Sequence, residues 1–68
     1  MTIHQYCADW RRSKGLTQQN MADALNVELS SVTRFERGKM RSFKILLGYI
    51  LAGMDIDREK IDRSDTDE

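Results

Sequence analysis

The sequence predicts a compact all-α domain, a bundle of four to five helices. The chain has 68 residues, which is enough for one hydrophobic core and too few for two. Apolar residues make up 40% of the chain and recur at spacings of three and four positions, the period of a helix buried on one side. Proline is absent, and glycines 15, 38 and 53 stand where the helical patterns end.

The first helix is expected over residues 2–13. One of its faces is apolar, because large side chains fall at positions i, i+3, i+4 and i+7: Ile3, Tyr6, Cys7 and Trp10. The hydroxyl of Thr2 can cap the first turn. Gly15 follows the last turn, where a left-handed backbone is common.

Two short helices joined by a tight turn follow. The second helix starts at Thr17, a good cap, and its inner side chains are Met21, Ala22 and Leu25. Asn26 suits the turn because asparagine tolerates a left-handed backbone. The third helix covers roughly residues 29–37, with Val32 and Phe35 pointing inward. The small polar and basic side chains left outside are typical of a helix-turn-helix that reads a DNA groove.

The fourth helix begins after Ser42, and it is apolar on more than one side. One set of its side chains is assigned to the core of the chain: Phe43, Leu46, Leu47 and Ile50. A second set is assigned to a homodimer interface: Ile45, Tyr49, Ala52, Met54 and Ile56. The domain is placed at residues 1–56, and residues 57–68 are expected to form a short acidic C-terminal helix or tail, with Asp57 as a cap.

The formal net charge of zero conceals a division along the chain. Residues 1–54 carry eight basic and four acidic side chains, whereas residues 55–68 carry three basic and seven acidic ones. A basic body with an acidic tail favours a polyanion as partner, and nucleic acid is the first candidate.

The segment GLTQQNMADALNVELSSVTRFERGK resembles the helix-turn-helix domain of Cro/C1-type (XRE-like) transcriptional regulators. Twelve positions agree in register: Gly15, Leu16, Thr17, Gln18, Ala22, Leu25, Val27, Val32, Arg34, Glu36, Gly38 and Lys39. The resemblance covers about residues 5–54 and implies a lambda-repressor-like fold. The sequence departs from the family pattern at Asn26, at Glu28, which is a poor helix cap, and at Met40-Arg41.

The resemblance also implies roles for individual residues. Base readout falls to Leu29, Ser30, Thr33 and Arg34, of which Arg34 suits a bidentate contact to guanine and Leu29 a thymine methyl group. Phosphate contacts fall to Gln18, Ser31, Arg37, Lys39 and Arg41. Arg11 and Glu36 are expected to form a structural ion pair between the first and third helices.

These expectations lead to a DNA-binding transcriptional regulator that binds an inverted-repeat operator as a homodimer. Repression is favoured over activation, and RNA polymerase is a further candidate partner. A phage or other mobile element is the context of many such small regulators. Two alternatives stay open: a protein-binding module such as an antitoxin, and a restriction-modification controller protein that also activates.

Several classes of protein are disfavoured. The sequence offers no nucleophile with a base, so no enzyme is expected. A single cysteine, Cys7, and a single histidine, His4, leave too few ligands for a metal site. No cofactor, small-molecule ligand or membrane partner is expected, and the cytoplasm is the expected location.

Overall fold

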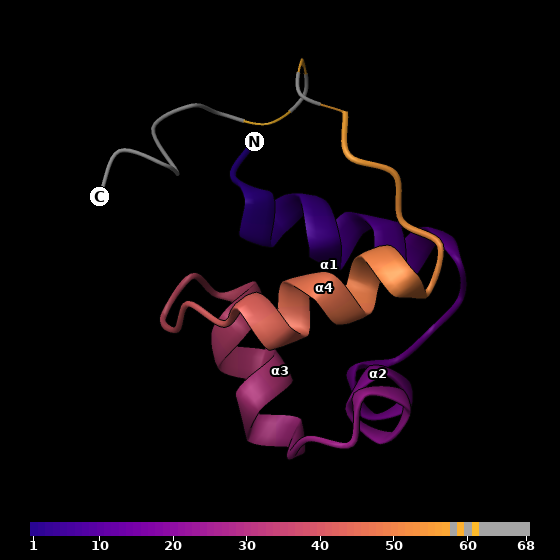
Figure 1. The fold of residues 1–68 in the computed structure, drawn as a ribbon, viewed down its shortest axis with the longest axis vertical. Coiled ribbons are helices and arrows are strands. Elements are labelled where there is room, and N and C mark those ends of the chain that lie inside the picture. The colour runs from indigo at the N-terminus through magenta and orange to yellow at the C-terminus, as the bar shows by residue number, and fades with distance from the viewer. Residues whose placement is uncertain (58, 60, 62–68) are drawn as a thin grey trace.

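The computed structural model describes residues 1–57, 59 and 61, and it contains four helices and no strand in this part of the chain (Figure 1). The helices are α1 (Ile3–Ser13), α2 (Gln18–Leu25), α3 (Leu29–Glu36) and α4 (Phe43–Leu51). The predicted all-α class is confirmed, and the four main helices start and end close to their expected positions. No helix among these described residues is long and apolar enough to cross a membrane.

Hydroxyl side chains cap three of the helices. The Thr2 hydroxyl accepts the Gln5 amide at 3.2 Å, and the Thr17 hydroxyl accepts the Asn20 amide at 3.0 Å. In both cases the side chain of the third helical residue accepts the amide of the cap in return, which completes a capping box. Ser42 caps α4 by accepting the Ile45 amide at 3.2 Å. These hydrogen bonds satisfy amides that a helix start leaves without partners, and they fix where α1, α2 and α4 begin.

A three-residue turn connects α2 to α3. Asn26 has the left-handed backbone expected for it, with φ of 58° and ψ of 46°. The Val27 amide then donates to the Ala22 carbonyl at 3.0 Å, which closes the C-terminal end of α2. Glu28 precedes α3 but makes no side-chain cap hydrogen bond, in agreement with its poor capping chemistry.

All four helices contribute to one core. Its fully or nearly fully buried members are Cys7, Met21, Ala22, Val32, Phe35, Ile45, Tyr49 and Met54. The Tyr49 ring lies at the centre, with its centroid 6.1 Å from that of Trp10 and 6.0 Å from that of Phe35. This core ties α4 to both α1 and α3.

The assignment of the two sides of α4 is therefore wrong. Ile45, Tyr49 and Met54, predicted for a dimer interface, are buried in the core of the single chain. Phe43, Leu47 and Ile50, predicted for that core, are exposed, and Leu46 is half-buried. Ala52 and Ile56 are exposed. The physical reason is that Gly48 leaves room for the Leu25 side chain of α2, and this rotation of α4 turns the neighbouring Ile45 and Tyr49 into the core.

The segment after α4 folds back onto α1. Met54 is buried, and the Tyr6 hydroxyl donates to the Asp55 carbonyl at 2.5 Å while it accepts the Asp57 amide at 3.2 Å. The Asp57 carboxylate accepts the Glu59 amide at 3.1 Å, so Asp57 closes a turn. Residues 57, 59 and 61 are not helical, and the rest of the predicted short helix or tail, at 58, 60 and 62–68, lies outside the described residues.

Gly48 provides a test of the packing between α4 and α2. A Cβ atom added at Gly48 would lie 2.2 Å from Cδ2 of Leu25, far inside van der Waals contact. Gly48→Ala is therefore expected to lower the free energy of unfolding by about 1–3 kcal/mol, although alanine is the better helix former. Urea denaturation measures the effect. The cost should shrink in a Leu25→Ala background, and an equal cost in both backgrounds would assign it to something other than this contact.

Candidate nucleic-acid interface

The outer face of α3 presents a short row of side chains to solvent. Val32 and Phe35 anchor the helix in the core. Leu29, Ser30 and Arg34 are exposed, and Ser31 and Thr33 are half-buried. Of the four predicted base-reading residues, three have side chains exposed to solvent: Leu29, Ser30 and Arg34. The fourth, Thr33, is half-buried beside α2.

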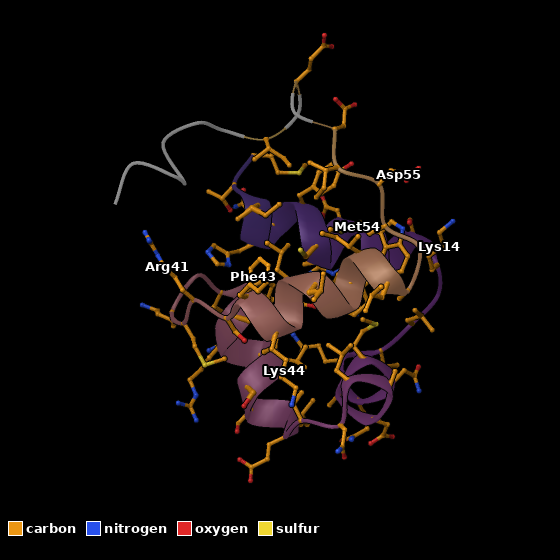
Figure 2. The ribbon with its side chains drawn as sticks, viewed as in Figure 1. Lys14, Arg41, Phe43, Lys44, Met54 and Asp55 are labelled. Atoms are coloured by element: carbon orange, nitrogen blue, oxygen red, sulfur yellow. The ribbon has the colours of Figure 1, made fainter. Side chains whose placement is uncertain are left out.

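The exposed acidic residue Glu28 is the N-cap of α3, but after it, as far as Lys44, the exposed charge is of one sign. Between residues 29 and 44 every exposed charged side chain is basic: Arg34, Arg37, Lys39, Arg41 and Lys44. Glu36, the one acidic residue in this range, is buried. Arg41 is labelled on the loop that leads into α4 in Figure 2, and Lys44 on the first turn of that helix. The structure therefore concentrates positive charge on α3, the following loop and the start of α4.

A buried ion pair joins α1 to α3. Nε of Arg11 lies 2.8 Å from Oε2 of Glu36, and Nη2 lies 3.0 Å from Oε1, which is a bidentate contact. The remaining guanidinium nitrogen, Nη1, donates to the Leu16 carbonyl at 2.8 Å. Both residues are less than 10% exposed. Arg11 and Glu36 thus occupy the positions that the resemblance implies.

Two further side chains complete this buried network. The Tyr49 hydroxyl of α4 donates a hydrogen bond to Oε2 of Glu36. Nε2 of Gln18, the first residue of α2, donates to Oε1 of Glu36 at 3.1 Å. The Glu36 carboxylate thereby holds side chains from α1, α2 and α4 against α3.

Gln18 also connects this network to the outer face of α3. The Thr33 hydroxyl donates to Oε1 of Gln18 at 2.9 Å. Gln18, predicted for phosphate, and Thr33, predicted for a base, are therefore hydrogen-bonded to each other. A contact to DNA must use their remaining capacity: the second amide hydrogen of Gln18 and the lone pairs of the Thr33 oxygen.

The network shifts the titration of its members. Burial raises the pKa of Glu36, but hydrogen bonds from Arg11, Tyr49 and Gln18 outweigh burial and hold it below its ordinary value. The hydrogen bond to Glu36 raises the pKa of Arg11 despite burial. Burial and the bond to Glu36 raise the pKa of Tyr49 far above its ordinary value. Glu36 is thus ionised and Tyr49 neutral at pH 7.

These shifts predict an acid-sensitive fold. The lowered pKa of Glu36 stabilises the folded chain above the ordinary carboxyl pKa of 4.5, and this contribution is lost as pH falls through the folded value. Urea midpoints measured from pH 7 to pH 3 should fall, and they should fall less for Glu36→Gln. An identical acid dependence in both proteins would mean that other carboxylates cause the loss.

At the alkaline end, the raised pKa of Tyr49 predicts that the free energy of unfolding declines above about pH 10.

Sequence reasoning missed the part that Tyr49 plays in this site. The sequence predicts Tyr49 for a dimer interface and Gln18 for a phosphate contact, and neither for a bond to Glu36. The available signal was the chemistry of Glu36, because a buried carboxylate needs more than one donor. A tyrosine on the core side of the next helix and a glutamine at the start of α2 are the side chains able to supply them.

Among the residues that the structure describes, no group of three potential ligands is placed to hold a metal ion. The candidate site consists of an exposed basic surface supported by a buried polar network.

Comparison with known protein families, curated proteins and solved structures found no match.

Proposed function

We propose that the chain is a sequence-specific DNA-binding transcriptional regulator, in which α2, the turn at Asn26 and α3 act as a helix-turn-helix. The observation that carries the proposal is the exclusively basic exposed charge from Arg34 to Lys44, next to the solvent-facing side of α3. An α-helix fits the major groove of B-DNA, and basic side chains beside it meet the phosphates that line the groove.

In this proposal, the loop between α3 and α4 provides most of the affinity. Arg37, Lys39 and Arg41 neutralise phosphates and release counterions, a term that depends on salt and not on sequence. Ser31 and the remaining amide hydrogen of Gln18 add neutral hydrogen bonds to the backbone. Together these contacts set the register in which α3 enters the groove.

The exposed side chains of α3 provide the specificity. Arg34 can donate two parallel hydrogen bonds to guanine O6 and N7, and Leu29 can pack on a thymine methyl group. Ser30 donates to or accepts from either kind of base edge, and Thr33 contacts the DNA from its place beside Gln18. Because the buried network holds α3 against α2 and α1, these side chains meet the groove from a rigid support.

One such domain reads only a few base pairs, so a homodimer on an inverted repeat is the proposed binding form. Repression by occlusion of a promoter needs nothing beyond this binding. Activation would also require a contact to RNA polymerase, and it is the weaker proposal.

The proposal is tested by selecting binding sites for the purified chain from a random duplex DNA library. The expected product is an inverted repeat with half-sites about one helical turn apart. Affinity for the selected site should fall steeply with salt, and Lys39→Ala should reduce the magnitude of the slope by about one unit.

Lys14→Ala is the matched control, because Figure 2 shows Lys14 at the opposite side of the molecule from Arg41. Lys14→Ala should leave the slope unchanged. A lack of sequence enrichment together with an affinity independent of salt would reject DNA binding.

A further inference from the structure

The outward face of α4 carries a continuous apolar stripe. Phe43 and Leu51 are 77% and 79% exposed, and Leu47 and Ile50 are 40% and 37% exposed. These four residues fall at positions i, i+4, i+7 and i+8, so they lie on one side of the helix, opposite the buried pair Ile45 and Tyr49. We refer to Phe43, Leu47, Ile50 and Leu51 as the α4 stripe.

We propose that the α4 stripe binds the α4 stripe of a second copy of this chain, with the two helices antiparallel about a two-fold axis near Leu47. The stripe is complementary to itself in this arrangement. Positions equidistant from residue 47 face one another, so Phe43 meets Leu51 of the other copy at both ends of the contact, and the two Leu47 side chains meet at the axis.

The charge at the edge of the stripe favours the antiparallel sense. Lys44 lies in the first turn of α4, where the helix dipole disfavours a positive charge, and the last turn of α4 carries no basic side chain. Antiparallel pairing places Lys44 beside the C-terminal turn of the other α4, around Ile50. Each Lys44 ammonium group then lies near the unpaired C-terminal carbonyl groups of the other helix, where the helix dipole favours a positive charge. A parallel pair would instead bring the two lysines together.

The C-terminal residues 62–68 do not complement the stripe. Residues 62–68 contain no apolar side chain, so this segment has nothing to bury against the four exposed side chains. The exposed apolar area of the stripe is on the order of a few hundred Å², below the roughly 800 Å² per partner of a stable complex. The pairing is therefore expected to be weak, with a dissociation constant in the micromolar range or above.

The proposed symmetry also matches the placement of the helices. In Figure 1, α4 crosses the front of the molecule and α2 and α3 extend below it. A two-fold axis drawn vertically in front of α4 reverses the direction of α4 and keeps α2 and α3 of both copies at the lower end. This step deepens the proposed function and rests on it, because both α3 helices would then face one DNA duplex.

Sedimentation equilibrium without DNA tests the pairing. For the wild-type chain, the weight-average mass should rise with concentration from 7.9 kDa towards twice that value. Leu47→Lys should stay monomeric at every concentration. Leu29→Lys is the matched control, because Leu29 is 42% exposed on α3 and lies outside the stripe, so it should dimerise as the wild type does.

A second measurement locates the axis. Helices packed about 8–10 Å apart bring facing Cα atoms within the reach of a disulfide, so Leu47→Cys should form an interchain disulfide on oxidation and Leu29→Cys should not. The native Cys7 is buried and does not compete. A wild-type chain that stays monomeric up to millimolar concentration, or equal cross-linking at both positions, would overturn the proposal.

Failure of this inference is distinguishable from failure of the proposed function. A monomer that still binds a single DNA half-site would reject the α4 pairing and the homodimeric binding form, but it would support DNA binding by α3. A dimer that loses its association in Leu47→Lys but binds no DNA would support the pairing and reject the DNA-binding proposal.

Discussion

Replacing Arg11 by alanine is expected to destabilise the fold by about 3–5 kcal/mol, because it leaves the Glu36 carboxylate buried without its counter-charge. Tyr49 and Gln18 still donate to Glu36, but neither carries a charge. A domain of this size has a total stability of only about 3–10 kcal/mol, so Arg11→Ala should be largely unfolded at 37 °C. Urea or thermal denaturation followed by circular dichroism measures the loss.

The chain offers a matched control on the same helix. Arg12 lies 3.4 Å from Asp9, and both side chains are more than half exposed. Arg12→Ala removes a solvent-exposed ion pair and should cost no more than about 0.5 kcal/mol. Equal denaturation midpoints for Arg11→Ala and Arg12→Ala would show that the buried Arg11–Glu36 pair contributes no more to stability than the exposed pair.

The helices of this chain are predictable because their limits are set locally. Thr2, Thr17 and Ser42 cap the helices that follow them, and Asn26 provides the left-handed turn between α2 and α3. Each of these signals involves residues within a few positions of one another, so no knowledge of the tertiary contacts is needed.

The rotation of α4 is not predictable in the same way. Its apolar side chains cover most of the helix circumference, so periodicity alone offers two solutions. The choice depends on contacts across the fold: Gly48 packs against Leu25, and the Tyr49 hydroxyl reaches Glu36. A glycine on one side of an apolar helix, next to an amphipathic tyrosine, indicates the side that packs most closely, and this signal could have corrected the assignment.

In the candidate site, too, some features follow from the sequence and others depend on tertiary contacts. The positions of Arg34 on α3 and of Lys39 in the loop after it follow from the motif, and the resemblance also implies the Arg11–Glu36 pair. The hydrogen bond from Thr33 to Gln18 joins residues fifteen positions apart, and it depends on the crossing of α2 and α3. Its consequence is that Thr33 and Gln18 act as one unit in any DNA contact.

Replacing Arg34 by alanine is expected to remove discrimination at one base position of the operator. The exposed Arg34 side chain is the one member of the α3 row that can form a bidentate contact to guanine, and such a contact contributes about 1–3 kcal/mol of discrimination. Affinity for the preferred site should therefore fall about 5- to 150-fold, and variants of the site at that base pair should bind the mutant equally well. Fluorescence anisotropy at fixed salt on the selected operator and its single-base variants measures both effects.

Lys39→Ala is the comparison that separates base readout from phosphate contact. Lys39 lies in the loop after α3, is exposed, and presents a point charge that has no geometric match to a base edge. Its loss should weaken binding to cognate and random duplexes by the same factor, whereas Arg34→Ala should weaken cognate binding selectively. An equal loss on cognate and random DNA for Arg34→Ala would place the Arg34 guanidinium on a phosphate and leave specificity to Leu29, Ser30 and Thr33.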